Sequence, residues 1–365
     1  MSITAQAGIF GYGLNANGLK GGAVATWYRH KAMMLGVAPV KEFDVAPPEI
    51  SGVNIPTGAF TTGSFYGGRV SIQPRLEDDL GWLLLALTGQ VTSAVHGSEA
   101  GVTVHDFTMK DGDGPFVPFM GVRRFIPGTS TATDIGEIGT DCVINNLTLN
   151  FPQVGPVSAD FDFTGLGWSL DEAPDVWTWD GVAENYDSVP MVMKGGGVTL
   201  PNWTPGGGSQ LPATGARVTF VNNTTSPQEE RIIGSYFPDD FAARQRQMMV
   251  EFTYKWADPD LCRLILNGNL AGVPGQSFAE QMTFTDFSLD IWSPNYMDPG
   301  TIDYPYKLTI TAPKMFWQAQ PVQLVGDDLI MMQLVGTAIE PDTALPEDYF
   351  KIALENETAA YTMPT

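Results

Sequence analysis

Asp160 and Asp162 are the pair of residues best placed to do chemistry, because they lie two positions apart and two carboxyl groups are what a glycosidase needs. Such an enzyme holds them in a cleft, often with aromatic platforms, and the chain is rich in acids and tryptophans. On a strand, however, residues two apart point to the same face, and repeated polar positions are typical of a solvated face. We therefore interpret both carboxylates, and likewise Glu251 and Asp290, as strand surface residues. A carbohydrate-binding or glycoside-active β-sandwich, secreted from the cell, is the alternative.

The histidines and cysteines are not spaced as metal ligands. His30, His96 and His105 stand far from one another and from any cysteine. Cys142 and Cys262 are widely separated, which is typical of small buried residues in a reducing compartment rather than of a disulfide-stapled secreted domain. No phosphate-binding loop, nucleophile elbow or calcium loop is complete. The sequence therefore predicts no catalytic, metal or cofactor site.

The charge balance excludes a protein that grips nucleic-acid phosphates. Lys and Arg number 19 against 41 Asp and Glu, which gives a net charge of −22, whereas phosphate binding needs surplus cations. Charged residues make up 16% of the chain, below the usual ~25%. With 40 Gly and 27 Pro, many turns and short strands are expected. The chain starts without a signal-peptide pattern, and its longest apolar stretch, Trp82–Leu87, is too short to span a bilayer.

Alternating apolar and polar residues predict most of the secondary structure. In one such stretch Ala159, Phe161 and Phe163 face one side and the intervening polar residues the other, as in an antiparallel sheet with one solvated side. The predicted strands are Val70–Leu76, His105–Met109, Phe116–Phe125, Val143–Phe151, Val157–Thr164, Arg217–Val221 and Met249–Trp256. A helix is expected from Leu80 to Gly89, and short helices at Trp27–Leu35 and Asp348–Glu355.

The order of elements occurs twice, which indicates an internal duplication. In both copies a strand precedes an acidic turn, a short Leu-rich helix and a glycine, and the second helix covers Leu261–Gly268. Further on, Phe287–Ile291 corresponds to Leu147–Phe151, and Asp328–Gly336 corresponds to Ser158–Gly165. The alternative is two unrelated β domains with similar patterning. We divide the chain into an N-terminal arm with loops (1–65), a first domain (66–180), a second domain (181–340) and a C-terminal arm (341–365).

The second copy resembles the major tail tube proteins of long-tailed, siphovirus-like bacteriophages. The resemblance rests on a strand that ends in Asn222-Asn223, the Pro238-Asp239-Asp240 element, the basic turn Arg244-Gln245-Arg246, the next strand and the short helix. It implies a mainly β fold with two tandem β-sandwich or partial-barrel domains, each with one short flanking helix, plus long arms and loops. It also implies a structural, non-enzymatic virion protein, made in the bacterial host cytoplasm, that forms the tail tube. A decoration protein or another virion protein is the structural alternative.

Family members form six-fold rings around a channel, so the resemblance implies that three two-domain chains complete a pseudo-six-fold ring. Implied partners are the chain itself, the tape measure, tail terminator and distal tail proteins, and DNA that passes without tight binding. A channel wall for DNA should be acidic or neutral, because a basic wall would bind phosphates. Our hypothesis is that polar strand residues line this channel, with outer solvent as the alternative location. They are Thr148, Asn150, Asp160, Asp162, Glu251, Thr253, Asp290, Thr309 and Thr311.

Overall fold

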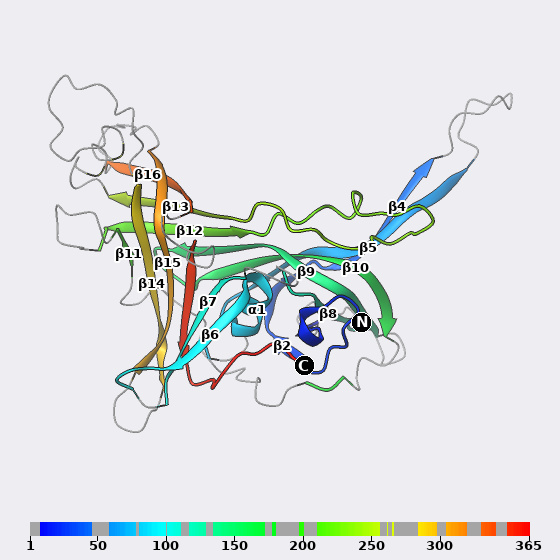
Figure 1. Ribbon diagram of the computed structural model, residues 1–365, viewed down its shortest axis with the longest axis horizontal. Coiled ribbons are helices and arrows are strands. Elements are labelled where there is room, and N and C mark those ends of the chain that lie inside the picture. Colours follow the sequence, from blue (N-terminus) through cyan, green and yellow to red (C-terminus); the bar gives the residue numbers. More distant parts are fainter. Residues whose placement is uncertain are drawn as a thin grey trace, which may run out of the picture.

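The computed structural model is a mainly β protein whose strands pair in antiparallel fashion around an α-helix (Figure 1). Its strands are joined by pairing into one large, branched and open sheet. The structure describes residues 8–45, 58–77, 80–99, 101–110, 117–128, 134–171, 177–179, 197–200, 210–255, 261, 265, 284–297, 304–319, 330–340 and 349–365. No helix in these ranges is long and apolar enough to cross a membrane.

The first half of the described chain contains ten strands, the helix and a 3-10 turn, in the following order. They are β1 (Ile9–Leu14), η2 (Ala16–Gly18), β2 (Tyr28–His30), β3 (Ala32–Leu35), β4 (Ala38–Val45), β5 (Ala59–Ile72), α1 (Leu80–Thr88), β6 (Gly89–Val95), β7 (Thr103–Met109), β8 (Met120–Ile126), β9 (Ile135–Pro152) and β10 (Ser158–Asp171). The second half contributes β11 (Val198–Thr199), β12 (Ala213–Val221), β13 (Gln247–Lys255), β14 (Phe284–Met297), β15 (Tyr304–Ala319), β16 (Met331–Ala338) and β17 (Lys351–Asn356).

A central path of paired strands runs through β5, β10, β9, β12, β13, β16 and β15. The pairing of β9 with β12 joins the two halves of the chain, with Leu149 opposite Val218. Because every neighbour is antiparallel, side chains of one face form rows across both halves, with register shifts only at Asp162/Phe163 and Ala213/Gly215 among these pairs. We call these seven strands the central sheet.

Two branches leave the central sheet and enclose the helix. The first part of β9 pairs with β8, which continues through β1 to β2. The first part of β15 pairs with β17, which continues through β7 to β6, while β14 pairs along the other edge of β15. In Figure 1, β9 and β12 lie along the upper side, β14 and β15 stand at the left, and α1 lies in the angle between them.

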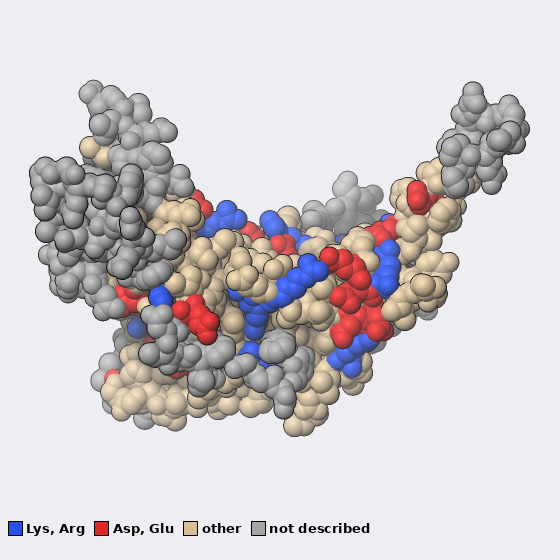
Figure 2. All heavy atoms as spheres, turned by 45° about the horizontal axis from the view of Figure 1, so that its top comes forward, with Lys and Arg blue, Asp and Glu red and all other residues tan. Residues whose placement is uncertain are grey.

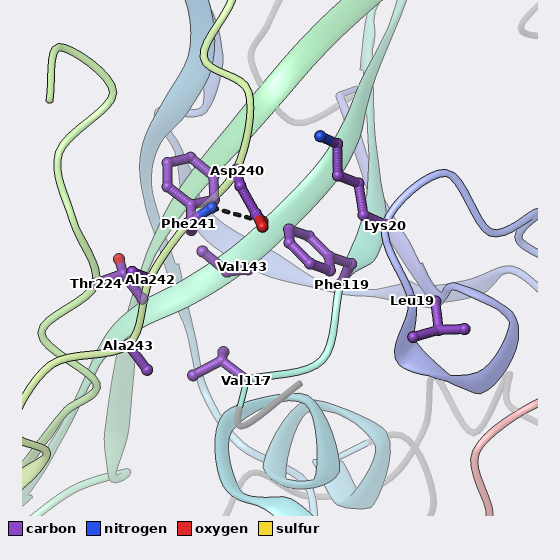
Figure 3. Close-up of a pocket in the computed structure, with 10 residues that line it drawn as sticks. All are labelled: Leu19, Lys20, Val117, Phe119, Val143, Thr224, Asp240, Phe241, Ala242 and Ala243. Atoms are coloured by element: carbon purple, nitrogen blue, oxygen red, sulfur yellow. Dashed lines mark hydrogen bonds between the residues drawn. The ribbon is translucent and has the colours of Figure 1, made fainter. Parts of the chain in front are cut away.

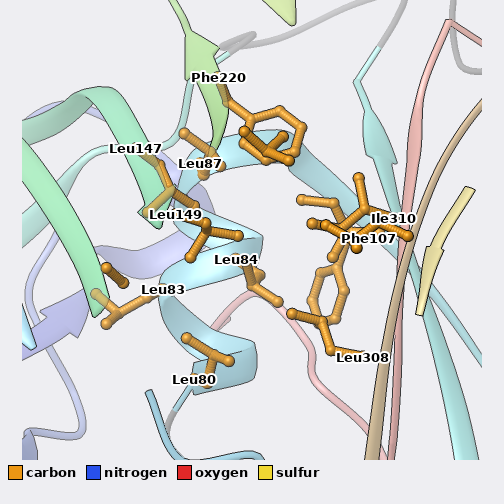
Figure 4. Close-up of a cluster of buried hydrophobic side chains, with 14 of the residues drawn as sticks. Leu80, Leu83, Leu84, Leu87, Phe107, Leu147, Leu149, Phe220, Leu308 and Ile310 are labelled. Atoms are coloured by element: carbon orange, nitrogen blue, oxygen red, sulfur yellow. The ribbon is translucent and has the colours of Figure 1, made fainter. Parts of the chain in front are cut away.

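The helix α1 is the centre of the hydrophobic core. Eight of its nine residues are buried, as expected for a helix that is apolar on every side. Each fully buried leucine contributes about 1.5–3 kcal/mol of transfer free energy. Figure 4 shows leucines of α1 packed against side chains from β7, β9, β12 and β15, so one core serves both halves of the chain. The labelled residues are Leu80, Leu83, Leu84, Leu87, Phe107, Leu147, Leu149, Phe220, Leu308 and Ile310.

Most predicted elements are confirmed, and α1 ends before Gly89, which has a positive φ of 89°. The predicted strand Phe116–Phe125 begins later, at Met120, and Phe116 lies outside the described residues. Of the predicted second helix, Leu261 and Ile265 are helical, and the remaining positions, Cys262 included, lie outside the described residues. Cys142 is buried and free, as expected.

The two short helices predicted near the chain ends are wrong. Residues 28–30 and 32–35 form β2 and β3, because each pairs with a strand, β1 and β5 respectively. Residues 351–356 form β17, which lies between β15 and β7 and is buried on both faces. Ile352, Ala353 and Leu354 are consecutive and all buried, so this strand lacks the alternation by which the other strands are recognised.

Part of the predicted N-terminal arm packs into the body of the protein. The aromatic side chains of Phe10 and Tyr12 and the side chain of Leu14 are buried in the core, since β1 pairs along its full length with β8. By contrast, the outer part of the β4–β5 hairpin projects from the body (Figure 1). Its strands are paired to each other from Ala38 to Val45.

Candidate functional site: the polar face of the central sheet

The central sheet has an apolar face and a polar face. Side chains such as Val70, Phe161, Leu149, Val218 and Val250 enter the core and are at most 1% exposed. The residues between them point the other way and form rows that cross the strands. One row is Ser71, Asp160, Thr148, Thr219 and Met249; another is Ser158, Asn150, Arg217, Glu251 and Val335.

The carboxylate of Asp162 is paired with Arg69, which is not among the predicted site residues. The guanidinium of Arg69 donates from Nε and Nη2 to the two carboxylate oxygens of Asp162, over 2.7 and 3.0 Å. Asn146 donates its amide Nδ2 to the same carboxylate over 3.2 Å. Hydrogen bonding to Asp162 raises the pKa of Arg69. Asp162 is therefore not a free negative charge on this face.

The other polar side chains of the first half also bond to one another across strands. The hydroxyl of Ser71 donates to Asp160, and Asn150 donates its amide to the hydroxyl of Ser158 over 3.3 Å. The hydroxyls of Thr148 and Thr219 lie 3.5 Å apart across the β9–β12 junction. These contacts join side chains that are cross-strand neighbours on an open sheet face. Asp160 and Asp162 thus form separate side-chain pairs and do not converge on a common point, as a glycosidase would require.

In the second half the same face is continued by Glu251 and Thr253 of β13. Gln333 of β16 donates its amide to the carboxylate of Glu251, and Thr253 lies opposite Gln333 in register. Arg217 of β12 is exposed and lies opposite Glu251. A shallow hollow of about 260 Å³ follows this part of the face, between Thr148, Arg217 and Glu251.

The rows of this face are neutral rather than acidic. Their charged residues are three cations, Arg69, Arg217 and Lys255, and three carboxylates, Asp160, Asp162 and Glu251. Figure 2 shows basic and acidic side chains next to one another on a surface that is mostly uncharged. The sequence could have placed these two cations on the polar face, because Arg69 and Arg217 each stand next to a valine, Val70 or Val218, that is buried.

Six of the nine predicted channel residues therefore lie on one continuous face: Thr148, Asn150, Asp160, Asp162, Glu251 and Thr253. The remaining three lie on the β14–β15 hairpin, where β15 pairs with β17 instead of β16. There Thr309 donates its hydroxyl to Asp290 over 2.8 Å, and the ammonium of Lys307 lies 3.9 Å from the same carboxylate. Thr311 belongs to the same stretch of β15. The structure does not bring this group together with the other six.

A long excursion between β12 and β13, residues 222–246, crosses the first half of the chain; we call it the strap (Figure 1). Phe241 and Ala243 of the strap pack on a small apolar cluster formed by Val117, Phe119, Val143 and Leu166. Figure 3 shows the pocket of about 440 Å³ between this cluster, the strap and Leu19. At its rim Lys20 donates to Asp239 over 3.1 Å.

Both ends of the strap are bonded to the C-terminal end of α1. The buried amide of Asn222 donates to the carbonyl oxygens of Leu87 and Ile144, over 3.0 and 2.7 Å. Its Oδ1 accepts from Nε of Arg246 over 2.8 Å. Arg246 in turn donates from Nη2 to the carbonyls of Leu87 and Thr88, and burial lowers its pKa to about 10. Asn222 and Arg246, which are part of the sequence signature, thus cap α1.

The described residues contain no cluster of three or more His, Cys, Asp or Glu that could hold a metal ion. What the described residues define is a β protein with an open sheet that has one buried and one wet face, and with projecting elements. This is the class of protein that is completed by assembly.

The comparison with known families identifies the group within this class. The model of the phage tail tube protein family matches residues 19–289, more than two thirds of the chain, and the chain belongs to this family. A search of curated proteins finds no match. The protein is therefore a structural component of the phage tail that assembles with itself into a tube. The family favours this role over a decoration protein or a secreted carbohydrate-binding domain.

Proposed function

We propose that three copies of this chain close into a pseudo-six-fold ring, and that stacked rings form the tail tube of a long-tailed phage that conducts DNA from capsid to host. The proposal rests on the order of strand pairing in the central sheet, which is similar in the two halves of the chain. In the first half, β5 precedes α1 and pairs with β10. In the second half, β13 precedes the helical residues Leu261 and Ile265 and pairs with β16.

The strand pairing also changes which strands of the two halves we propose to correspond. β10 pairs with β9, and β16 pairs with β15, so β15 rather than β14 takes the position of β9. Likewise β3 pairs with β5 where β12 pairs with β13. The divisions 66–180 and 181–340 remain our proposed domain bounds, with residues 1–65 and 341–365 as flanking arms.

The edges of the sheet indicate how the ring would close. Within the chain, the last part of β9 pairs with β12 of the following half. By the same rule, the edge of β15 opposite β16 would pair with β3 of the next chain, but only beyond Phe316, because β14 already pairs with that edge up to this residue. Along β3, Met33 and Met34 are 54% and 47% exposed, although methionine is a residue that normally packs against a partner. An open strand edge with apolar side chains is a template for pairing with another chain.

Ring closure would turn the polar face of the central sheet into the wall of a channel. A duplex carries one negative charge per ~1.7 Å, so a wall with surplus cations would hold it. In the rows described above, Asp160, Asp162 and Glu251 each have a cation or a hydrogen-bond donor beside them, and their three charges are balanced by Arg69, Arg217 and Lys255. Such a wall lets DNA slide without retention. Asp290, Thr309 and Thr311 remain proposed channel residues only if the β14–β15 hairpin also reaches the channel.

The ring is tested by the mass and shape of the assembled protein. Native mass spectrometry of single rings should give three times the chain mass of 39.5 kDa, and negative-stain images should show six lobes around a hole. Six chains per ring would contradict the tandem arrangement, and a solid particle or a persistent monomer would contradict the tube itself.

The channel is tested by reversing the charge of its wall. Phage that carry Asp160→Lys together with Thr219→Lys should assemble tails but eject DNA more slowly, and raising the salt concentration should restore the rate, because phosphate contacts are screened. Thr92→Lys, on exposed β6 away from this face, is the matched control. Ejection that is unchanged at low salt would show that this face does not line the channel. The proposed tape measure, terminator and distal tail partners would be the other components of those tails.

A further inference from the structure

The segment that follows β17, residues 357–365, crosses α1 and ends against the first half of the chain; we call it the latch. Figure 1 shows its end, marked C, beside the turn η2. There the backbone N–H of Asn17 donates to the carbonyl oxygen of Pro364. The latch therefore connects β17 of the second half to η2 of the first half by way of the helix.

Tyr361 anchors the latch, because it is the one buried residue among these nine, at 2% exposed. Its ring lies on the backbone of α1, where a Cβ atom at Gly81 would be 2.1 Å from the ring. The ring of Trp82 meets it edge-on with centroids 5.2 Å apart, and the ring of Phe107 lies 5.8 Å away. We call the site around Tyr361 the socket. It is formed by Gly81, Trp82, His105, Phe107 and Asn356.

The floor of the socket is polar and binds both the hydroxyl and the backbone of the latch. Asn356 is fully buried, and its amide donates to the hydroxyl of Tyr361 over 2.8 Å and to the carbonyl of Leu76 over 3.1 Å. The Oδ1 atom of Asn356 accepts from the backbone N–H of Thr358 over 3.0 Å. It also lies 3.0 Å from Nε2 of His105. An aromatic slot with an amide at its base fits a tyrosine on an extended peptide.

His105 forms one wall of the socket and is fully buried. The ring of Tyr361 lies edge-on to the imidazole, with centroids 4.6 Å apart. With the Asn356 oxygen as acceptor, Nε2 carries the proton of the neutral imidazole, and Nδ1 accepts from the Ser93 hydroxyl over 2.8 Å. A second proton would place a positive charge beneath Tyr361, away from water, and such a charge is costly.

The side chains packed around His105 do little to offset that cost. Its neighbours from β6, β17 and the latch are Ser93, Asn356 and Tyr361, of which Tyr361 alone can titrate. The helix α1 contains no charged residue. Burial lowers the pKa of His105 and outweighs its hydrogen bonds and the charge of Asp106 on β7, which act in the opposite direction. The closed socket therefore favours the neutral imidazole.

We propose that the socket is a binding site for a tyrosine-containing peptide, that the latch is its dissociable resident ligand, and that protonation of His105 releases the latch. A segment with a single buried side chain has few contacts to lose, so it opens at a low cost in free energy while the rest of the fold stays closed. Opening exposes His105 to water, where the imidazolium is stable, and low pH therefore favours the open latch. The device belongs to the single chain and does not depend on ring formation.

A peptide in solution tests the socket. The full-length variant Tyr361→Ala leaves the socket empty, so a fluorescent peptide with the sequence of residues 357–365 should bind to it. The same peptide with alanine in place of Tyr361 should not bind. The wild-type chain should bind the peptide at least tenfold more weakly, because its own latch competes at an effective concentration on the order of 1 mM.

Two results would overturn the binding site. The latch can stay closed in the intact chain only if its affinity exceeds that effective concentration, so Tyr361→Ala that binds no peptide at about 1 mM would refute the proposal. A Tyr361→Ala chain that unfolds as a whole, judged by circular dichroism, would show that residues 357–365 belong to the cooperative fold and are not a ligand of it.

Hydrogen exchange of the latch amides tests the release. Measured by mass spectrometry and corrected with the free peptide, the ratio of open to closed latch should rise up to about tenfold between about pH 7.5 and 5.5. An exposed imidazole, with a pKa of about 6.5, changes from mostly neutral to mostly protonated over this range. His105→Gln should abolish the rise. His96→Gln is the matched control and should retain it, because His96 contacts Tyr304 and not the latch. Opening that is independent of pH, or equally dependent on pH in His105→Gln, would refute the role of His105.

Discussion

Replacing Asn222 with alanine tests whether the signature residues act by joining the two halves. In the folded chain the Asn222 amide donates to Leu87 and Ile144, and its oxygen accepts from Arg246. The first of these carbonyls lies in the last turn of α1 in the first half, whereas Arg246 directly precedes β13 in the second half. The substitution removes all three bonds without adding bulk.

The expected cost follows from the groups that are left without a partner. The Leu87 carbonyl keeps its bond from Arg246, so the Ile144 carbonyl and the Nε–H of Arg246 carry the loss. An unsatisfied buried polar group costs about 1–3 kcal/mol, and more when it is charged. Because the Arg246 site already lowers the pKa of the guanidinium by burial, little water is present to replace the amide oxygen. We expect Asn222→Ala to lower the free energy of unfolding by about 2–6 kcal/mol, the sum of these two penalties.

Urea unfolding of the unassembled chain, followed by tryptophan fluorescence, measures this change. The matched control is Asn223→Gly, since Asn223 is exposed and has a φ of 50° that glycine accepts at no steric cost. The control should stay within about 0.5 kcal/mol of the wild type. If Asn222→Ala behaved like the control, the strap would not cap α1, and the structural explanation of the signature would be wrong.

Three further predictions concern the core. Leu84→Ala, at a site that is 1% exposed, should cost about 2–5 kcal/mol in urea unfolding. Gly81→Ala should cost about 1–3 kcal/mol, because the added Cβ would lie 2.1 Å from the Tyr361 ring, and most of that cost should vanish in a Tyr361→Ala background. Burial lowers the pKa of His105, which bonds to Asn356; since protonation then favours the unfolded chain, stability should fall as pH drops below about 6.5, the unfolded pKa, and His105→Gln should flatten this pH dependence.

The elements that alternation predicted are those with one wet and one dry face. Residues 158–164 of β10 and 249–255 of β13 show the expected pattern, buried at every second position. The helix α1 was predicted by its acids, its leucines and Gly89, which are local signals. These features need no knowledge of which strand is the neighbour, and this is why they could be read from the sequence.

What the sequence could not show depends on long-range pairing. β17 is a strand because it pairs with β15 at one edge and with β7 at the other, and its short apolar stretch Ile352–Leu354 does not by itself distinguish a strand from a helix. The strap has few apolar residues of its own, and its place on the β4–β5 hairpin depends on Arg231 meeting Glu42, 189 positions away in the chain. The pairing of Arg69 with Asp162 is of the same kind.

In the proposed tube, the position of the charges would allow a chain with a net charge of −22 to offer DNA a wall that neither binds nor strongly repels it. On the central face Arg69 neutralises Asp162, whereas Ser71 and Gln333 are neutral donors to Asp160 and Glu251, whose charges are balanced by Arg217 and Lys255 in the same rows. A face whose charges sum to zero has a field that falls off quickly with distance. The acidic surplus of the chain therefore lies away from these rows, where it keeps the unassembled subunit soluble without adding an electrostatic barrier to the path that DNA would follow.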